Sequence, residues 1–162
     1  MGECVRCYRC GVPEPGSVCR ACGVAQVGER YGRWNRGRFS LAIAEEQFPQ
    51  VSLRSGMWYI ARAAIRTGLS PNQLAAAMNP RFRGSRWVSL PGHLSVSSFQ
   101  GALRPRWTDP DHASHRYQCD CDEDLFLHDG ETWALSSQWD KQSKDDPVEI
   151  GRAFPSLRIV WK

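Results

Sequence analysis

Apolar positions repeat with a helical period in the middle of the chain. Between positions 55 and 67 they recur every three or four residues, which predicts an amphipathic helix that Gly68 would end. The segment 70–73, Ser-Pro-Asn-Gln, is a capping box with proline at the first helical position, and it predicts a shorter helix that ends at Asn79. Two helices joined by a tight, glycine-containing turn predict a helix-turn-helix-like unit.

The segments on either side of this unit have shorter patterns. Over 40–48, Ser40 is placed to cap a short helix with one apolar face, which Pro49 would stop. The segments 87–90 and 94–96 predict two short strands around a Pro-Gly pair. Such an arrangement is compatible with a wing that follows the two helices.

The last third of the chain predicts a hairpin, a helix and a strand. The apolar runs 125–128 and 131–135 flank an Asp-Gly pair, which is typical of a two-residue hairpin turn. A second capping box starts at Asp146 and predicts a helix that ends before Pro155, and the run 157–161 predicts a final strand. We expect this strand to pair with the hairpin, giving a small α+β unit.

Five cysteines lie near the N-terminus, and four of them form two Cys-x-x-Cys-Gly units. The tight turn in each unit aims backbone N–H groups at the sulfurs, and the glycine permits the left-handed conformation that the turn needs. Four thiolates complete a closed tetrahedral site, for which zinc is favoured, although the ligands would also accept iron. Cys4 is left out because the Cys-x-x-Cys that it begins lacks the following glycine. The predicted ligands of one structural Zn²⁺ are Cys7, Cys10, Cys19 and Cys22.

Residues 4–23 resemble the short zinc-ribbon family through these two units. Ribbons of this kind occur in nucleic-acid enzymes, in transcription factors and as protein-docking modules. The resemblance therefore implies a structural metal site and leaves its purpose open. The alternative is a set of reduced cysteines without metal.

A second group of metal-ligating residue types lies further along the chain. Its spacing fits no established ligand pattern, so buried or surface thiols are the alternative to a second ion. The residues concerned are His112, His115, Cys119 and Cys121.

Charge is divided unevenly along the chain. Residues 1–108 contain fifteen arginines, no lysine and five glutamates, a net charge of +10, whereas residues 109–162 carry a net charge of −6. The asymmetry predicts a polyanion-binding surface in the first part; the alternative is a high arginine content on ordinary solvated faces. Arginines neutralise phosphates, and the amides of asparagine and glutamine read adenine, although here they can also cap helices. The predicted nucleic-acid contacts are Arg33, Arg36, Arg38, Asn72, Gln73, Arg81, Arg83 and Arg86.

These patterns together predict an α+β protein in four parts. They are a zinc ribbon over 1–24, a basic Gly/Arg linker over 25–38, a helical, helix-turn-helix-like region with short strands over 39–108, and an acidic α+β tail unit over 109–162. The sequence does not determine whether the last two parts share one core.

The tail over 117–161 is similar to the tails of bacterial restriction- and modification-associated DNA-binding proteins. The resemblance implies a DNA-handling context and supplies no catalytic residues. It departs at Asp140, where a glycine is expected after the tryptophan. The two matching tryptophans, Trp133 and Trp139, could line a pocket for a base or pack into the tail's core. The matching residues are Asp124, Leu125, Gly130, Thr132, Trp133, Ala134, Leu135, Ser136, Gln138 and Trp139.

Three classes of function follow from these observations. The first is a zinc-containing protein that binds DNA, as duplex, without catalysis of its own, in a bacterial or phage DNA-transaction or defence context. The second is an adaptor or inhibitor that docks on a protein partner through the ribbon and the acidic tail. The third is a metal-dependent nuclease, in which Asp120, Asp122 and His115 are the candidate catalytic residues, although the usual nuclease motifs are absent from the sequence. The sequence shows neither a signal peptide nor a spanning apolar run, so a cytoplasmic protein without a membrane partner is expected.

Overall fold

The computed structural model describes residues 39–104, 116–139 and 141–162. Within them the chain forms two three-stranded antiparallel sheets and several short helices, which confirms the predicted α+β class. The strands are β1 Phe39–Ile43, β2 Glu46–Val51, β3 Trp87–Pro91, β4 Leu125–His128, β5 Glu131–Leu135 and β6 Ile159–Trp161. The α-helices are α1 Leu53–Arg66, α2 Pro71–Ala77, α3 Val96–Leu103 and α5 Asp146–Ala153. Short 3-10 helices are η2 Pro80–Ser85, η4 Asp122–Asp124, η5 Lys141–Ser143 and η6 Pro155–Leu157.

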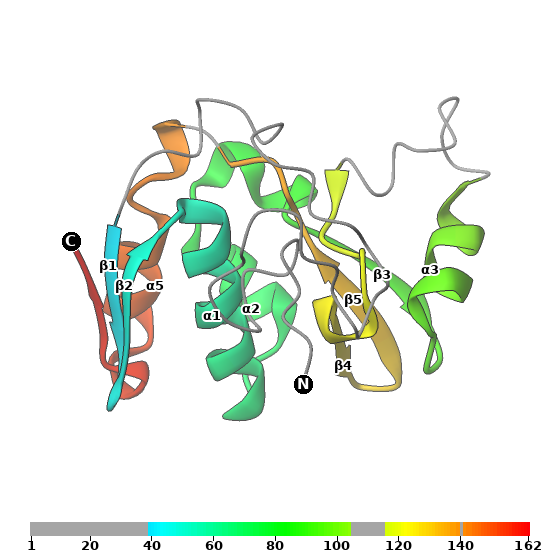
Figure 1. Cartoon of the computed structure of the whole chain (residues 1–162), viewed down its shortest axis with the longest axis horizontal. Helices are drawn as coiled ribbons and strands as arrows, with labels where there is room; N and C mark the ends of the chain where they lie inside the picture. The colour runs from blue at the N-terminus through cyan, green and yellow to red at the C-terminus, as the bar shows by residue number, and fades with distance from the viewer. Residues whose placement is uncertain (1–38, 105–115, 140) are drawn as a thin grey trace, which may run out of the picture.

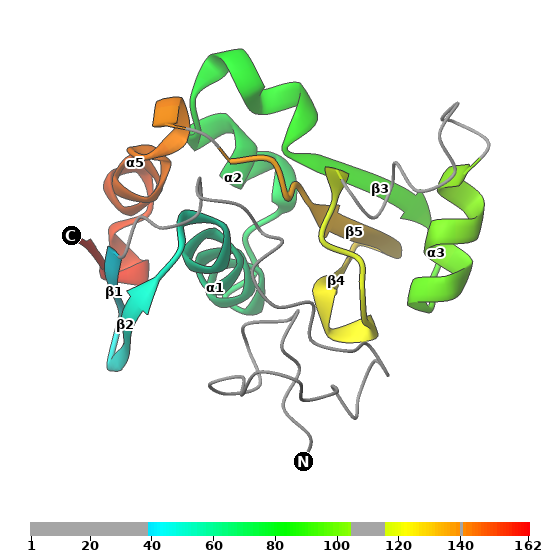
Figure 2. The same cartoon turned by 45° about the horizontal axis from the view of Figure 1, so that its top comes forward.

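The two sheets lie on opposite sides of α1, as Figures 1 and 2 show. On one side α1 contacts β1 and β2, and on the other it contacts β4. Helix α2 packs along α1, and α5 packs against α2 and β6. Helix α1 is thus the central element around which the rest of the described chain is arranged.

The first sheet begins with a hairpin where the sequence predicted a helix. Strands β1 and β2 pair with Ile43 opposite Glu46, and Ala44 takes a φ of 52° in the turn between them. The prediction of a helix over 40–48 is therefore wrong. Its apolar residues also fit a period of two, since Leu41 and Ile43 are both buried, and β6 pairs with the other edge of β1. Pairing with a strand from the far end of the chain overrode the local helical pattern.

The final strand joins the first sheet. The sequence predicted that it would pair with the C-terminal hairpin, and this is wrong: β6 pairs with β1, with Leu41 opposite Trp161. The sheet order is β2-β1-β6. The ring of Trp161 stacks on Phe39 with 4.4 Å between the ring centroids, so the two ends of the described chain meet in one sheet.

The second sheet contains the predicted Asp-Gly hairpin. Asp129 and Gly130 have φ values of 49° and 72°, as a two-residue turn between β4 and β5 requires. Strand β3 pairs with β5, which gives the order β3-β5-β4. The prediction of a second wing strand over 94–96 is wrong. Ser95 there accepts a hydrogen bond from the backbone N–H of Ser98 and begins α3.

The two helices predicted to form the helix-turn-helix-like unit are confirmed as α1 and α2. In the capping box of α2, Ser70 Oγ accepts from the Gln73 N–H at 3.1 Å, and Gln73 Oε1 accepts from the Ser70 N–H at 2.8 Å. Helix α5 also forms and ends before Pro155. Its N-cap residue is Asp145 rather than Asp146, because the Asp146 side chain is buried and bonded to other parts of the chain.

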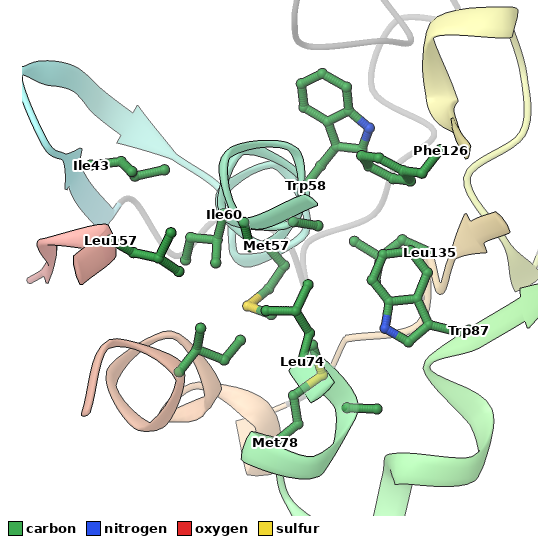
Figure 3. Close-up of a cluster of buried hydrophobic side chains, with 14 of the residues drawn as sticks. Ile43, Met57, Trp58, Ile60, Leu74, Met78, Trp87, Phe126, Leu135 and Leu157 are labelled. Atoms are coloured by element: carbon green, nitrogen blue, oxygen red, sulfur yellow. The ribbon is translucent and has the colours of Figure 1, made fainter. Parts of the chain in front are cut away.

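The main hydrophobic core surrounds α1. Figure 3 shows Met57, Trp58 and Ile60 of this helix meeting side chains from β1, α2 and the second sheet. A second cluster lies around Phe99 and Leu103 of α3. Both clusters, and both sheets, combine residues from 39–104 with residues from 116–162, so the predicted middle and tail units share one core. No helix of the described segments combines the length and apolar character needed to span a membrane.

Candidate nucleic-acid interface

The exposed side of α1 carries two arginines that the sequence analysis did not select. The guanidinium of Arg62 lies 4.9 Å from the centroid of the Trp58 ring and 5.8 Å from that of Tyr59, so two aromatic rings position it. Arg66 follows one turn later and is exposed. Neither arginine forms an ion pair with a carboxylate of the described chain. Their four-residue spacing on the polar side of the predicted helix was the available signal.

Asn72 and Gln73 lie at the start of α2, on the far side of the turn from Arg66. Both are exposed, but the side-chain oxygen of Gln73 accepts the hydrogen bond that completes the capping box. A base could bind to Gln73 through its amide nitrogen while the oxygen keeps this role. With seven residues, α2 extends about 10 Å, which is short for a recognition helix.

Arg81 and Arg83 lie beyond the C-terminal end of α2, on η2. Arg81 donates to Gln142 Oε1 at 2.9 Å, and Arg83 donates through Nε to the Met78 carbonyl at 3.2 Å. A depression of about 390 Å³ beside them is lined by Arg83 together with Asp145, Asp146 and Glu149. Carboxylates of α5 therefore lie close to these two arginines and reduce the positive potential there.

Among the predicted phosphate contacts that lie within the described residues, Arg86 is the one whose position contradicts its assigned role. Its residue surface is 2% exposed. The guanidinium donates to the Gln138 carbonyl at 2.8 Å and to Ser143 Oγ, and it lies 3.3 Å from the Asp146 carboxylate. The Trp139 ring centroid is 4.1 Å away. This arginine connects η2 to the segment before α5 and is not available to a nucleic acid.

Asn79 takes part in the same connection. Its backbone N–H donates to Asp146 Oδ1 at 2.8 Å, and its side-chain Nδ2 donates to the Gln142 carbonyl at 3.2 Å. Its Oδ1 accepts from the Arg81 N–H at 3.1 Å, which caps η2. The structure thus separates the predicted contacts into one group at the α1–α2 turn and another beside α5.

The candidate catalytic carboxylates do not converge. The Asp120 side chain is 6% exposed and faces Arg54 at 4.0 Å. Asp122 is exposed, and its Oδ1 accepts from the Val96 N–H at 2.7 Å at the start of α3. Within the described segments, no three His, Cys, Asp or Glu side chains are grouped so that they could hold a metal ion. His115, the third candidate, lies outside the described residues.

Cys119 and Cys121 fit the buried-thiol alternative. Both are buried, and the segment that carries them is not a strand. Desolvation by burial, together with the nearby Asp120 charge, raises the pKa of the Cys119 thiol to about 12, so the thiol is protonated at neutral pH. His112 and His115, the other two members of the proposed second metal site, lie outside the described residues.

Trp133 and Trp139 are partly buried and pack against the core around α1. Trp133 contacts the core around α1 and lies edge-to-face with Trp87. Trp139 covers Arg86 and donates its indole N–H to the Ser136 carbonyl at 2.7 Å. Packing, rather than a base pocket, is therefore the arrangement that the structure has for both.

Several predicted site residues lie outside the described part of the chain. They are the zinc ligands Cys7, Cys10, Cys19 and Cys22 and the arginines Arg33, Arg36 and Arg38. The chain matches no protein-family model, no curated protein and no solved structure at a significant level.

Proposed function

We propose that this is a zinc-containing DNA-binding protein without catalysis of its own. The observation that carries the proposal is an unbalanced set of surface arginines. Five arginines of residues 39–104 reach the surface without an ion-pair partner in the described chain: Arg62, Arg66, Arg81, Arg83 and Arg104.

The acidic tail weakens this charge beside Arg81 and Arg83, where carboxylates at the start of α5 lie close, but it forms no ion pair with Arg62 or Arg66 in the described chain. Its carboxylates pair with two arginines of the middle region, Arg54 and Arg86, and both of these are buried. The tail's exposed pairs involve its own arginines, Arg152 with Glu149 at 2.6 Å and Arg158 with Glu45 of the first sheet at 3.2 Å. Surface arginines without an ion-pair partner, such as Arg62 and Arg66, are suited to binding phosphate groups, because this binding releases the counterions condensed on the nucleic acid.

The pair Arg62 and Arg66 is the most favourable phosphate-binding part of this surface. The two side chains are one helical turn apart, Asn72 is exposed across the turn, and Arg62 is held by aromatic rings rather than by a carboxylate. Arg33, Arg36 and Arg38 would add further phosphate contacts. The structure offers few groups for reading bases, so we expect binding governed mainly by the nucleic-acid backbone.

Fluorescence anisotropy with labelled duplex DNA, single-stranded DNA and RNA tests this proposal directly. We expect zinc-loaded protein to bind DNA and to lose affinity steeply as salt rises. In the double variant Arg62→Gln/Arg66→Gln, the plot of the logarithm of the association constant against the logarithm of the salt concentration should become less steep. The magnitude of its slope should decrease by about 2, since each lost phosphate contact accounts for about 1. Melting temperatures would establish that the variant folds.

The tail provides a matched control. Arg152→Gln/Arg158→Gln also removes two exposed arginines, but both are engaged with glutamates, so the salt slope should not change. Absence of binding at low salt would reject the proposed function. Equal losses in both double variants would show that binding depends on overall charge and not on the α1 surface.

The zinc assignment makes a separate prediction. We expect one equivalent of zinc per chain by mass spectrometry of the purified protein, and a chelator such as EDTA in excess should remove it. Cys10→Ser should lose the metal, whereas Cys4→Ser should retain it, since Cys4 is outside the predicted ligand set. Loss of zinc from both variants would show that the ligand set is wrong, and two equivalents would point to a second site.

A further inference from the structure

The outer edge of β4 has backbone groups without partners. This strand, Leu125–His128, ends the sheet order β3-β5-β4 and pairs with β5 on one side. In a hairpin with a two-residue turn, the closing pair exchanges backbone hydrogen bonds, and so does the pair that contains Phe126. The N–H and C=O groups of Leu125 and Leu127 therefore point away from β5. The Leu125 N–H donates to the Asp122 carbonyl at the end of η4. For the Leu125 C=O and for both backbone groups of Leu127, the described chain provides no hydrogen-bond partner.

The other sheet edges are protected in ways that β4 is not. Strand β2 contains Pro49 and has a register irregularity against β1. Strand β3 ends in Pro91, and β6 has three residues. Proline, irregular pairing and short length are features with which proteins prevent added strands. Strand β4 has no proline, no lysine and no bulge.

A depression lined by both apolar and polar residues lies on the sheet face next to this edge. It has a volume of about 340 Å³, and its lining includes Leu94, Asp122, Leu127 and Thr132. Leu127 is 45% exposed, an unusual value for a leucine within a strand. Because successive side chains of a strand alternate between faces, every second side chain of an added strand would lie over the depression.

The charges around β4 indicate what kind of segment would bind. Asp122 lines the depression, Asp129 follows the strand in the turn, and Glu131 begins β5. Two copies of β4 paired antiparallel would bring these acidic residues together, so a second copy of this chain is disfavoured. A segment with basic side chains would complement them.

We propose that the outer edge of β4 binds an extended segment of another protein, with aliphatic side chains facing the depression and lysine or arginine side chains near Asp122 and Asp129. The segment would join the second sheet as a fourth strand. Its backbone would bond to the outward N–H and C=O groups of Leu127 and to the C=O group of Leu125. This inference does not depend on the proposed DNA binding, which uses the opposite charge on another surface.

Amide hydrogen exchange followed by NMR tests the proposal on the full chain. The probe is a short synthetic peptide that alternates valine and lysine, with a valine–glutamate peptide as its control. We expect the lysine peptide to slow exchange of the Leu127 amide at least about tenfold, since this amide would gain a hydrogen bond. The Leu125 amide, already bonded to the Asp122 carbonyl, and the Phe126 amide, already bonded to β5, should change little. The glutamate peptide should leave all three unchanged.

A positive charge placed on the edge of β4 should weaken binding of the lysine peptide and the protection from exchange that it gives. Leu127→Lys should weaken peptide binding by about tenfold or more, because a lysine on an edge strand opposes both pairing and a basic partner. Val160→Lys is the matched control, since Val160 is 48% exposed on β6. Equal binding to both variants, equal binding of the glutamate peptide, or no protection at millimolar lysine peptide would overturn the proposal. A homodimer in sedimentation that Leu127→Lys dissociates would also overturn it, in favour of contact between copies.

Discussion

Replacing Arg86 with methionine is expected to lower the free energy of unfolding by about 3–5 kcal/mol, as measured by urea denaturation. The change would remove the guanidinium that pairs with the buried Asp146 carboxylate and that donates to the Ser143 hydroxyl and the Gln138 carbonyl. An unpaired buried charge is among the costliest single defects that a fold can carry. The stacking of the guanidinium on Trp139 would be lost as well.

Two further variants separate the ion pair from simple loss of a side chain. Arg83→Met is on the same short helix but exposed, and we expect it to change the unfolding free energy by no more than about 0.5 kcal/mol. In Arg86→Met/Asp146→Asn, the charge is gone while an acceptor remains for the Asn79 N–H, so the combined cost should be smaller than the sum of the single costs. Additive losses would show that Arg86 and Asp146 do not act as a pair.

Gly56→Ala is expected to destabilise the protein by about 1–3 kcal/mol, although alanine is the better helix former. Gly56 lies in the first turns of α1, and a Cβ there would approach two ring atoms of Trp161 at 2.5 and 2.8 Å. The ring would have to move, and it is already stacked on Phe39. The substitution therefore tests whether the C-terminal strand is docked on α1.

Gly101→Ala provides the control for this prediction. Gly101 lies in α3, and nothing lies within 4 Å of the position that its Cβ would take. There the higher intrinsic helix propensity of alanine should dominate, and we expect the free energy of unfolding to rise by up to about 1 kcal/mol. If thermal or urea unfolding showed the same rise in the free energy of unfolding for Gly56→Ala, Trp161 would not pack against α1 as described.

The elements with strong local signals were predictable. Helices α1 and α2 follow from an apolar repeat and a capping box, and the β4–β5 hairpin follows from its Asp-Gly turn. In each case the deciding interactions lie within about four residues of one another, such as the two hydrogen bonds between Ser70 and Gln73. Such contacts can form before any long-range packing and are encoded in adjacent residues.

The candidate site was predictable to a smaller extent. Composition alone indicates an arginine-rich surface, but it does not distinguish Arg86, which is buried, from Arg66, which is exposed. The difference depends on Asp146 and Ser143, which lie about 60 residues further along the chain. Asp146 itself looked like a helix cap in the sequence, and it became the counter-charge of Arg86 because α5 packs against α2.

Local hydrogen bonds and apolar periodicity specify helices α1, α2 and α5 and the turn between β4 and β5, and composition specifies the uneven distribution of charge. Long-range packing makes residues 39–43 and 46–51 form strands, pairs β6 with β1, and gives the acidic tail and the arginine-rich part a common core. Strand pairing and charge burial depend on partners far away in the chain, and their energies exceed local preferences of a few tenths of a kcal/mol per residue.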